Sequence, residues 1–394
     1  MRPGAGSVAA ASLSLVLALL LSAATAAWAV DEPLTQASDD LVFRSPGAFT
    51  SPERMRLNDV TRAGTRLVAV GERGVIVISE DNGSSWSQAQ VPVSATLTAV
   101  MFVNDRLGWA VGHAGVILHS SDAGSTWQLQ FDGNRANAAY RDYTQVKREL
   151  LEAEVEALEA QAGPEEAQAL DDMAYALEDA VFAQEDAQDA LATGPADPFL
   201  DVLFVSESRG YAVGAYGMLY TTDDGGAQWQ IAIEGIDNVE RFHYYSIAAG
   251  NADTLYLSGE AGLLYVSGDG GTSWQRIPDL YDGSLFGVVV ATDEVMTFGL
   301  RGNNFVSSDV GISWQKKETD QSYSLYGGSL LDDGRVALVG AGGSVLLLDE
   351  SGQIARYSHP SRSTFSSVAQ ASDGSVVLVG MDGVGRLDEA EQLQ

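Results

Sequence analysis

The amino-acid sequence predicts an all-β fold, a seven-bladed β-propeller with an inserted α-helical hairpin. Three observations lead to this prediction. A unit of about 40 residues recurs along the chain, five of the units end in an Asp–Trp box, and one interruption has helical periodicity. A period near ~40 with several short apolar strands per unit is typical of a propeller blade. We expect the propeller to occupy residues 41–394.

Each unit contains a short apolar strand, a second strand that ends in glycine, a two-residue turn and a third strand. The clearest copy is LTAVMFV (97–103) followed by GWAVGHAGVILHSSDAGSTW (108–127). One four-stranded blade cannot bury both of its faces, so the blades must stack into a ring. Seven blades are predicted because the strand-closing glycine recurs at Gly71, Gly112, Gly214, Gly259, Gly299, Gly340 and Gly380. A six-bladed ring with one stray unit is the alternative.

The last unit, 365–387, contains three strands before the chain runs into DEAEQLQ. We expect residues 41–44, at the start of the mature chain, to supply the missing outer strand. Pairing the two ends of the chain in this way would close the ring and leave no open strand edge.

An eight-residue box of the form Ser/Thr-x-Asp-x-Gly-x-x-Trp ends five units. The aspartate can accept hydrogen bonds from backbone N–H groups two or three residues further on, and the glycine suits a positive φ. We expect the tryptophan to pack beneath the turn, between adjacent blades. One carboxylate per box is too few for calcium, so the boxes are interpreted as structural, and no metal or other cofactor is expected. The box residues are Asp81 and Trp86, Asp122 and Trp127, Asp224 and Trp229, Asp269 and Trp274, and Asp309 and Trp314.

These repeats, with Val-Gly-x-x-Gly before an Asp box, resemble the photosystem II stability/assembly factor family over roughly residues 57–387 outside the interruption. The resemblance implies a seven-bladed propeller of the thylakoid lumen or the bacterial periplasm. It also implies a non-enzymatic assembly factor that binds immature membrane-protein subunits. Photosynthetic members carry a basic patch and lack the long interruption, whereas this chain is strongly acidic. We therefore expect a secreted bacterial member with a helical insertion, and the photosynthetic substrate is not carried over.

The interruption, residues 132–198, lies between the second and third units. It carries 17 acidic and 4 basic residues and few β-branched ones. Gly163-Pro164 predicts a break between two helices of about 25 residues that fold against each other. An acidic disordered loop is the alternative, but apolar stripes argue against it. The stripe residues are Leu151, Val155, Leu158 and Ala162 before the break, and Leu170, Met173, Leu177 and Val181 after it.

The turns between the second and third strands of the blades form a candidate binding rim. Because the chain crosses each blade four times, these turns share one face of the ring with the links between blades, and the Asp boxes lie on the opposite face. The hairpin should leave from the face of the rim, so that one partner could contact both. Ordinary solvated turn residues are the alternative. The candidate partner-binding residues are Arg73, His113, Tyr216, Glu260, Arg301 and Asp382.

The N-terminus and the charge restrict the location and the partners. Residues 1–29 contain Arg2, an apolar run and small-residue cleavage sites, which predicts a signal peptide and a periplasmic or secreted protein. An uncleaved anchor is the alternative; after cleavage no direct membrane insertion is expected. A net charge of −32 disfavours nucleic acid. The absence of cysteine excludes disulfides and cysteine nucleophiles.

These observations favour a protein that binds a protein partner, a membrane-embedded complex such as a transporter, and that is not an enzyme. The alternative is a carbohydrate-active, sialidase-like propeller, because Asp boxes also occur in sialidases. Such an enzyme needs arginines on its inner strands, and the segments predicted to be inner strands, such as LNDV and LTAVMFV, contain none. Arg73, Arg301, Tyr216 and Glu260 could imitate its catalytic set. The four histidines show no metal-ligand spacing.

Overall fold

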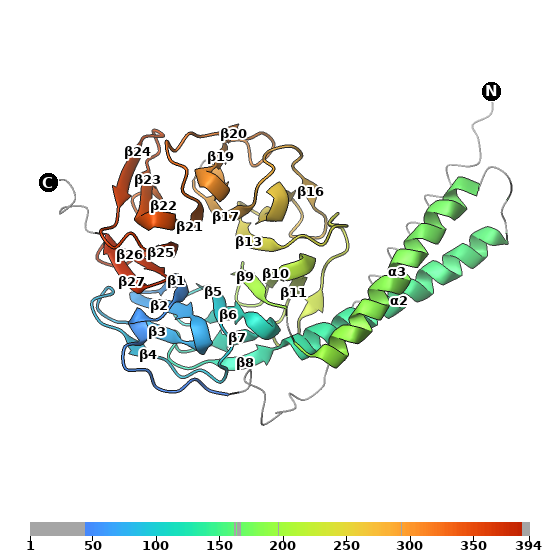
Figure 1. Ribbon diagram of the computed structural model, residues 1–394, viewed down its shortest axis with the longest axis horizontal. Helices are drawn as coiled ribbons and strands as arrows, with labels where there is room; N and C mark the ends of the chain where they lie inside the picture. The colour runs from blue at the N-terminus through green and yellow to red at the C-terminus, as the bar shows by residue number, and fades with distance from the viewer. Residues whose placement is uncertain (1–43, 161–162, 164–166, 196, 293, 388–394) are drawn as a thin grey trace. The chain divides into compact units, whose positions relative to one another are not determined.

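The computed structural model describes residues 44–160, 163, 167–195, 197–292 and 294–387. The chain forms two compact units. One is a ring of seven antiparallel sheets, and the other contains the helical residues 134–194 (Figure 1). The sheets confirm the seven-bladed propeller.

Each blade is built from strands that follow one another in the chain. Blade 1 has β1 (Leu57–Ala63), β2 (Arg66–Gly71), β3 (Ile76–Ser79) and β4 (Ser87–Gln88). Blade 2 has β5 (Leu97–Phe102), β6 (Gly108–Gly112), β7 (Ile117–Ser120) and β8 (Gln128–Phe131). Blade 3 has β9 (Phe199–Phe204), β10 (Gly210–Gly214), β11 (Leu219–Thr222) and β12 (Gln230–Ile231).

The remaining blades repeat this plan. Blade 4 has β13 (Tyr244–Ala249), β14 (Leu255–Gly259), β15 (Leu264–Ser267) and β16 (Gln275–Arg276). Blade 5 has β17 (Leu285–Val290), β18 (Val295–Gly299), β19 (Asn304–Ser307) and β20 (Gln315–Lys316). Blade 6 has β21 (Leu325–Leu330), β22 (Val336–Gly340), β23 (Ser344–Leu348) and β24 (Ile354–Ser358). Blade 7 has β25 (Phe365–Gln370), β26 (Val376–Gly380) and β27 (Gly383–Leu387).

The core of the ring lies between neighbouring blades. The second strands are buried along their length in all blades, which is why they read as continuous apolar runs ending in glycine. The first strands contact one another around the ring, and β25 contacts β1 to close it. Between blades 2 and 3 the filling is aromatic, because Trp109 stacks on Phe204 with ring centroids 3.5 Å apart.

The predicted closing strand, residues 41–44, lies outside the described residues except for Arg44. Blade 7 has three strands within the described part of the chain. The segment that follows the predicted strand covers the junction of blades 1 and 7. The Phe49 N–H donates to Gln88 Oε1 at 3.0 Å, and Phe49 and Met55 pack with Trp86 and Val384 against the core of this junction.

The Asp boxes have one repeated hydrogen-bond pattern. In the first box, Asp81 Oδ1 accepts from the N–H of Ser85 at 2.8 Å and Oδ2 accepts from the Ser85 hydroxyl at 2.6 Å. The Ser79 hydroxyl accepts from the Gly83 N–H at 2.8 Å. The aspartate therefore accepts from the residue four positions ahead, not two or three, because the Ser79 hydroxyl already accepts from the nearer N–H, that of Gly83. These bonds lower the pKa of Asp81 to about 2.

The interruption forms helices α2 (Gly133–Glu159) and α3 (Ala167–Thr193). They run antiparallel, since Asn137 near the start of α2 donates to the Ala190 carbonyl near the end of α3 at 2.9 Å. On α3 the buried residues are Ala180, Gln184 and Ala187, whereas Val181 of the predicted stripe is only partly buried. Leu170, Met173 and Leu177 of the stripe are partly buried in the same way, and at about 100° per residue they share a side of the helix with the buried residues.

The insertion leaves and re-enters the ring at one place. A Cβ placed on Gly133 would lie 2.6 Å from Pro195 Cβ and 2.7 Å from the Ala114 carbonyl oxygen. Ala114 belongs to η5 (His113–Gly115), the turn between β6 and β7. The chain therefore leaves the ring beside one of the rim turns, and glycine at position 133 permits this close approach.

We expect Trp127→Ala to lower the free energy of unfolding by about 3–5 kcal/mol, because truncating a buried aromatic leaves a cavity. The Trp127 ring is 4 % exposed, and it packs between Val68 of blade 1 and Phe102 of blade 2. Chemical denaturation measures the change. The neighbouring exposed Gln128→Ala is the control and should change stability by less than about 0.5 kcal/mol. Equal stability of the two variants would show that the box tryptophans do not hold adjacent blades together.

Candidate functional site

The turns between second and third strands define one face of the ring, which we call the turn face. It consists of η4 (Glu72–Gly74), η5, η6 (Ala215–Gly217), η7 (Glu260–Gly262), η8 (Leu300–Gly302), η9 (Ala341–Gly343) and the turn at Met381 and Asp382. The Asp boxes join third to fourth strands and so lie at the opposite ends of the blades. Every predicted rim residue lies on the turn face.

Three predicted rim residues have a left-handed backbone. Arg73, Tyr216 and Arg301 have φ values of 56°, 52° and 59°. The same turn position is left-handed at Ala114, Ala261 and Gly342, so this conformation belongs to the repeated turn, and glycine is the residue that fits it best. Tyr216 is 51 % exposed, so the fold holds a large aromatic ring in solvent on a backbone that glycine would fit better.

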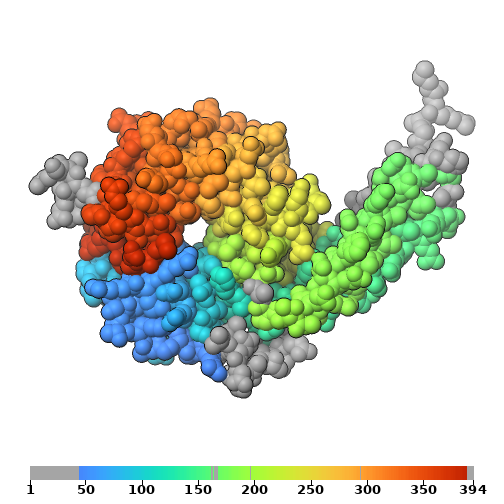
Figure 2. Space-filling model, in the orientation of Figure 1, coloured from blue at the N-terminus to red at the C-terminus, as the bar shows by residue number. Residues whose placement is uncertain are grey.

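A cavity of about 1020 Å³ opens at the centre of the ring. Its wall is made by the first strands of the blades together with Glu72, His113 and Met381 of the turn face. The space-filling view shows the ring hollowed at its centre (Figure 2). Because the first strands begin at the turn face, the cavity lies at that end of the ring.

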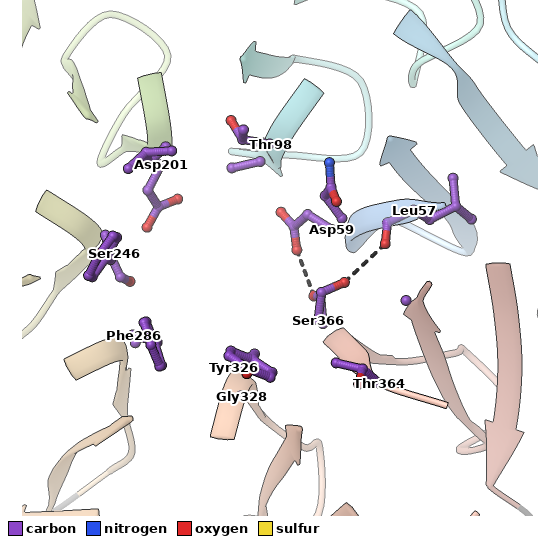
Figure 3. A pocket seen from close by; sticks show the side chains of 18 of the residues that line it. Leu57, Asp59, Thr98, Asp201, Ser246, Phe286, Tyr326, Gly328, Thr364 and Ser366 are labelled. Atoms are coloured by element: carbon purple, nitrogen blue, oxygen red, sulfur yellow. Dashed lines mark hydrogen bonds between the residues drawn. The ribbon is translucent and has the colours of Figure 1, made fainter. Parts of the chain in front are cut away.

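The second residue of each first strand faces the next blade. In three blades it is polar and donates to the carbonyl of the first residue in the following blade. Asn58 Nδ2 donates to the Leu97 carbonyl at 2.7 Å, and Thr98 Oγ1 donates to the Phe199 carbonyl at 2.7 Å. Ser366 makes the corresponding bond to Leu57 at 3.0 Å, which ties blade 7 to blade 1 (Figure 3).

In blades 4 to 6 the same position is aromatic. Tyr245 and Phe286 have ring centroids 5.4 Å apart, and Phe286 and Tyr326 lie 5.3 Å apart. The series continues outward, because His243 lies 6.3 Å from Tyr245 and 4.8 Å from Tyr216. We call these five residues the aromatic arc. It runs from the η6 turn along the rim of the cavity, and Tyr326 is 38 % exposed.

The third residue of the first strand is an aspartate in blades 1 and 3. Asp59 Oδ2 accepts from the Val100 N–H of blade 2 at 2.8 Å, and its Oδ1 accepts from the Ser367 hydroxyl of blade 7 at 2.6 Å. Asp201 Oδ2 accepts from the Ile247 N–H of blade 4 at 2.9 Å. Both side chains point into the cavity wall (Figure 3). Each carboxylate therefore links neighbouring blades.

Burial raises the pKa of Asp59, and it raises the pKa of Asp201 to about 7, with a further contribution from the negative charge of Asp59. The backbone N–H donors oppose this shift but do not cancel it. Asp201 therefore changes its charge near neutral pH, at the centre of the ring.

The predicted rim residues separate into two groups. Tyr216 and Glu260 meet at His243: the Tyr216 N–H donates to His243 Nδ1 at 2.8 Å, and the His243 N–H donates to Glu260 Oε2 at 3.2 Å. His113 lines the cavity, where burial and the nearby Arg56 charge lower its pKa. Arg73, Arg301 and Asp382 lie on other turns and are not in the cavity wall.

The aromatic arc, the role of His243 and the two aspartates were not predicted from the sequence. One signal was present, because the first strands of blades 1 and 3 share the letters Asp-Val at the same register, LNDV and FLDV. The aromatic residues at the second position of blades 4, 5 and 6 were a second signal. Neither signal predicts a site by itself, because these residues come together only when the blades pack side by side.

Arg56 is the single arginine among the described residues that line the cavity, whereas a sialidase needs several. The described part of the chain contains no group of three or more histidine, aspartate or glutamate side chains placed to hold a metal. Within the same residues, no helix combines the length and apolar character needed to cross a membrane.

The fold and the site together define an Asp-box propeller with an arc of aromatic residues along the rim of its central cavity. A sequence family described as "Photosynthesis system II assembly factor YCF48" matches residues 50–142 and 183–371, which is more than half of the chain. The chain belongs to this family, which confirms the resemblance seen in the repeats. No curated protein matches it by sequence.

Solved structures show the same fold. A structure of YCF48 bound to D1 peptide is 16 % identical, has a TM-score of 0.50 and is matched over 76 % of this chain and 85 % of that one. YCF48 from Cyanidioschyzon merolae is 14 % identical, with a TM-score of 0.54 over 87 % and 97 %. The GH74 enzyme of Niastella koreensis is 12 % identical, with a TM-score of 0.53 over 88 % and 53 %. At these identities the likeness concerns the fold alone.

We expect the unfolding free energy to fall as the pH rises from about 4 to about 7. In this range native Asp201, with its raised pKa of about 7, holds a proton that the unfolded chain, with a pKa of 3.8, gives up. The slope for this one group is at most about 1.4 kcal/mol per pH unit. Denaturant unfolding at several pH values measures it, and the contribution should disappear in Asp201→Asn.

The control for this measurement is Asp309→Asn in the fifth box. Its hydrogen bonds lower the pKa of Asp309 to about 2, so its stabilising effect is present above pH 3.8 and is lost only as the pH falls toward 2. The control should keep the wild-type slope between pH 4 and 7. An unchanged slope in Asp201→Asn would contradict the raised pKa.

Proposed function

We propose that the protein is a non-enzymatic assembly factor that acts in the periplasm or after secretion and binds a membrane-embedded protein complex, such as a transporter. It binds this partner through the turn face of the ring, and the helical hairpin supplies a second contact. The aromatic arc is the observation that carries the proposal. Membership of an assembly-factor family supports the same conclusion.

The arc has the properties of a protein-binding surface. Tyrosine and phenylalanine offer a large contact area at a low entropic cost, and aromatic residues are enriched where binding energy is concentrated. Tyr245 and Phe286 are held by their neighbours in the arc, so they lose little freedom on binding. Tyr216 is 51 % exposed at a turn position where other blades carry alanine or glycine, as at Ala114, Ala261 and Gly342, so its ring is available to a partner.

A polypeptide is the best-supported kind of partner. One family structure contains YCF48 together with a D1 peptide, which supports a peptide segment as the ligand of this propeller too. The net charge of −32 disfavours nucleic acid and anionic lipid surfaces. The photosynthetic substrate is not part of the proposal, because the likeness to that structure is one of fold.

A carbohydrate-active enzyme is less well supported. The GH74 structure shares the fold, and Asp59 and Asp201 are two carboxylates at one cavity. However, both oxygens of each carboxylate accept hydrogen bonds from backbone N–H groups of the protein itself. These carboxylates therefore stabilise the contacts between blades. Hydrolysis of fluorogenic sialosides that is lost in Tyr216→Phe would favour the enzyme over the binding protein.

The test compares two variants that remove exposed side chains from opposite faces. Tyr216 (φ 52°, 51 % exposed) lies on the turn face, and Val310 (φ 61°, 57 % exposed) lies in the Asp box of blade 5. Because glycine accepts a positive φ, Tyr216→Gly and Val310→Gly should both fold with an unchanged or slightly raised melting temperature.

The tagged protein is used to capture its partner from detergent-solubilised membranes, and the captured complex is quantified by mass spectrometry. Tyr216→Gly combined with Tyr326→Ser should reduce the recovery of the complex at least about tenfold, as expected for loss of central aromatic contacts. Val310→Gly should recover it as well as the wild type does. Equal recovery by all three proteins would refute binding through the turn face.

A further inference from the structure

The outer face of α3 carries a second pattern that packing within the hairpin does not explain. Acidic pairs recur every seven residues, at Asp171 with Asp172, Glu178 with Asp179, and Glu185 with Asp186. A single aromatic residue lies between successive pairs: Tyr175 in the first interval and Phe182 in the second. At 1.5 Å per residue, each interval is about 10 Å long.

These aromatic rings point away from the buried side of the helix. Tyr175 is 70 % exposed and Phe182 is 56 % exposed, whereas Ala180, Gln184 and Ala187 are buried. At about 100° per residue, Phe182 lies roughly half a turn from Ala180, and Tyr175 shares its face because seven residues make nearly two turns. The two rings thus form an apolar line between two rows of carboxylates.

The charge of this face restricts what can cover it. α3 contains seven acidic residues and no basic one. On α2, Arg148 pairs with Glu152 at 3.4 Å, Arg141 pairs with Asp142, and Lys147 lies over the Tyr143 ring. A second copy of α3 would bring like charges together, which opposes a dimer through this face. The parts of the chain outside the described residues contain one basic residue, Arg2, so they cannot neutralise it either.

We propose that this face of α3 binds a helix of the partner protein that has its own seven-residue repeat, with apolar residues flanked by lysine or arginine. The apolar residues of that helix lie on Tyr175 and Phe182, and its basic residues reach the carboxylates on both sides. This arrangement is that of a coiled coil, in which an apolar line gives affinity and flanking charges select the partner. The inference rests on the proposed function and names the chemistry of its second contact.

The probe is a synthetic three-heptad peptide with leucine at the two core positions and lysine at the flanking positions. Its control is the same peptide with glutamate in place of lysine. Binding to the full-length protein is measured by fluorescence anisotropy at low and at moderate ionic strength. We expect the lysine peptide to bind, the glutamate peptide not to bind, and the affinity to fall as salt screens the charges.

Three variants locate the contact. Tyr175→Gln with Phe182→Gln removes the apolar line but keeps good helix formers, and should weaken binding at least about tenfold. Glu178→Gln with Glu185→Gln should weaken it by a similar factor and reduce its salt dependence. Glu156→Gln with Glu159→Gln makes the same change of charge at exposed positions of α2 and should alter the affinity less than about twofold. Circular dichroism checks that helix content is retained.

Several outcomes would overturn the inference. These are equal binding of the two peptides, equal loss in the α2 control, and self-association of the wild-type protein that the Tyr175→Gln, Phe182→Gln variant abolishes. The ring variant Tyr216→Gly should bind the lysine peptide normally. The peptide assay can therefore fail while the turn face still captures the membrane complex, and the two proposals are tested separately.

Discussion

Packing between adjacent blades is the interaction on which the rest of the structure depends. A four-stranded sheet of this length has two apolar faces, and each face becomes buried only when another blade covers it. The ring is closed where β25 meets β1, and there Ser366, Ser367 and Asp59 add hydrogen bonds between the first and last blades. The Asp-box tryptophans fill the same junctions at the opposite ends of the blades.

The proposed binding face is a consequence of this packing. The second residue of each first strand must meet the next blade, so its type decides what the centre of the ring offers. In blades 1, 2 and 7 that residue is polar and closes the junction with a hydrogen bond. In blades 4 to 6 it is aromatic, and the three rings lie side by side and line the cavity. One half of the ring thus provides closure, and the other half provides the surface that we propose binds the partner.

Much of the fold was predictable because short local sequence motifs determine it. A glycine closes each second strand since a side chain there would collide with the start of the first strand; at Gly112 a Cβ would lie 2.2 Å from the Thr96 carbonyl oxygen. The Asp boxes and the Gly163-Pro164 break are local in the same sense. The aromatic arc was not predictable in this way. Its ends, Tyr216 of blade 3 and Tyr326 of blade 6, are more than a hundred residues apart and are connected only when the blades between them pack together. On α3 the predicted stripe is partly buried, whereas the fully buried Ala180, Gln184 and Ala187 were not singled out because alanine and glutamine carry little apolar signal.

Hydrogen–deuterium exchange of the protein alone and with its captured membrane complex tests the central claim, which is that the partner binds the turn face. The account predicts slower exchange in the η6 turn, around His243 and at the start of β21, where the aromatic arc lies. The Asp-box turns, which serve as the internal reference on the opposite face, should exchange at unchanged rates. Protection confined to the Asp-box turns would contradict the account.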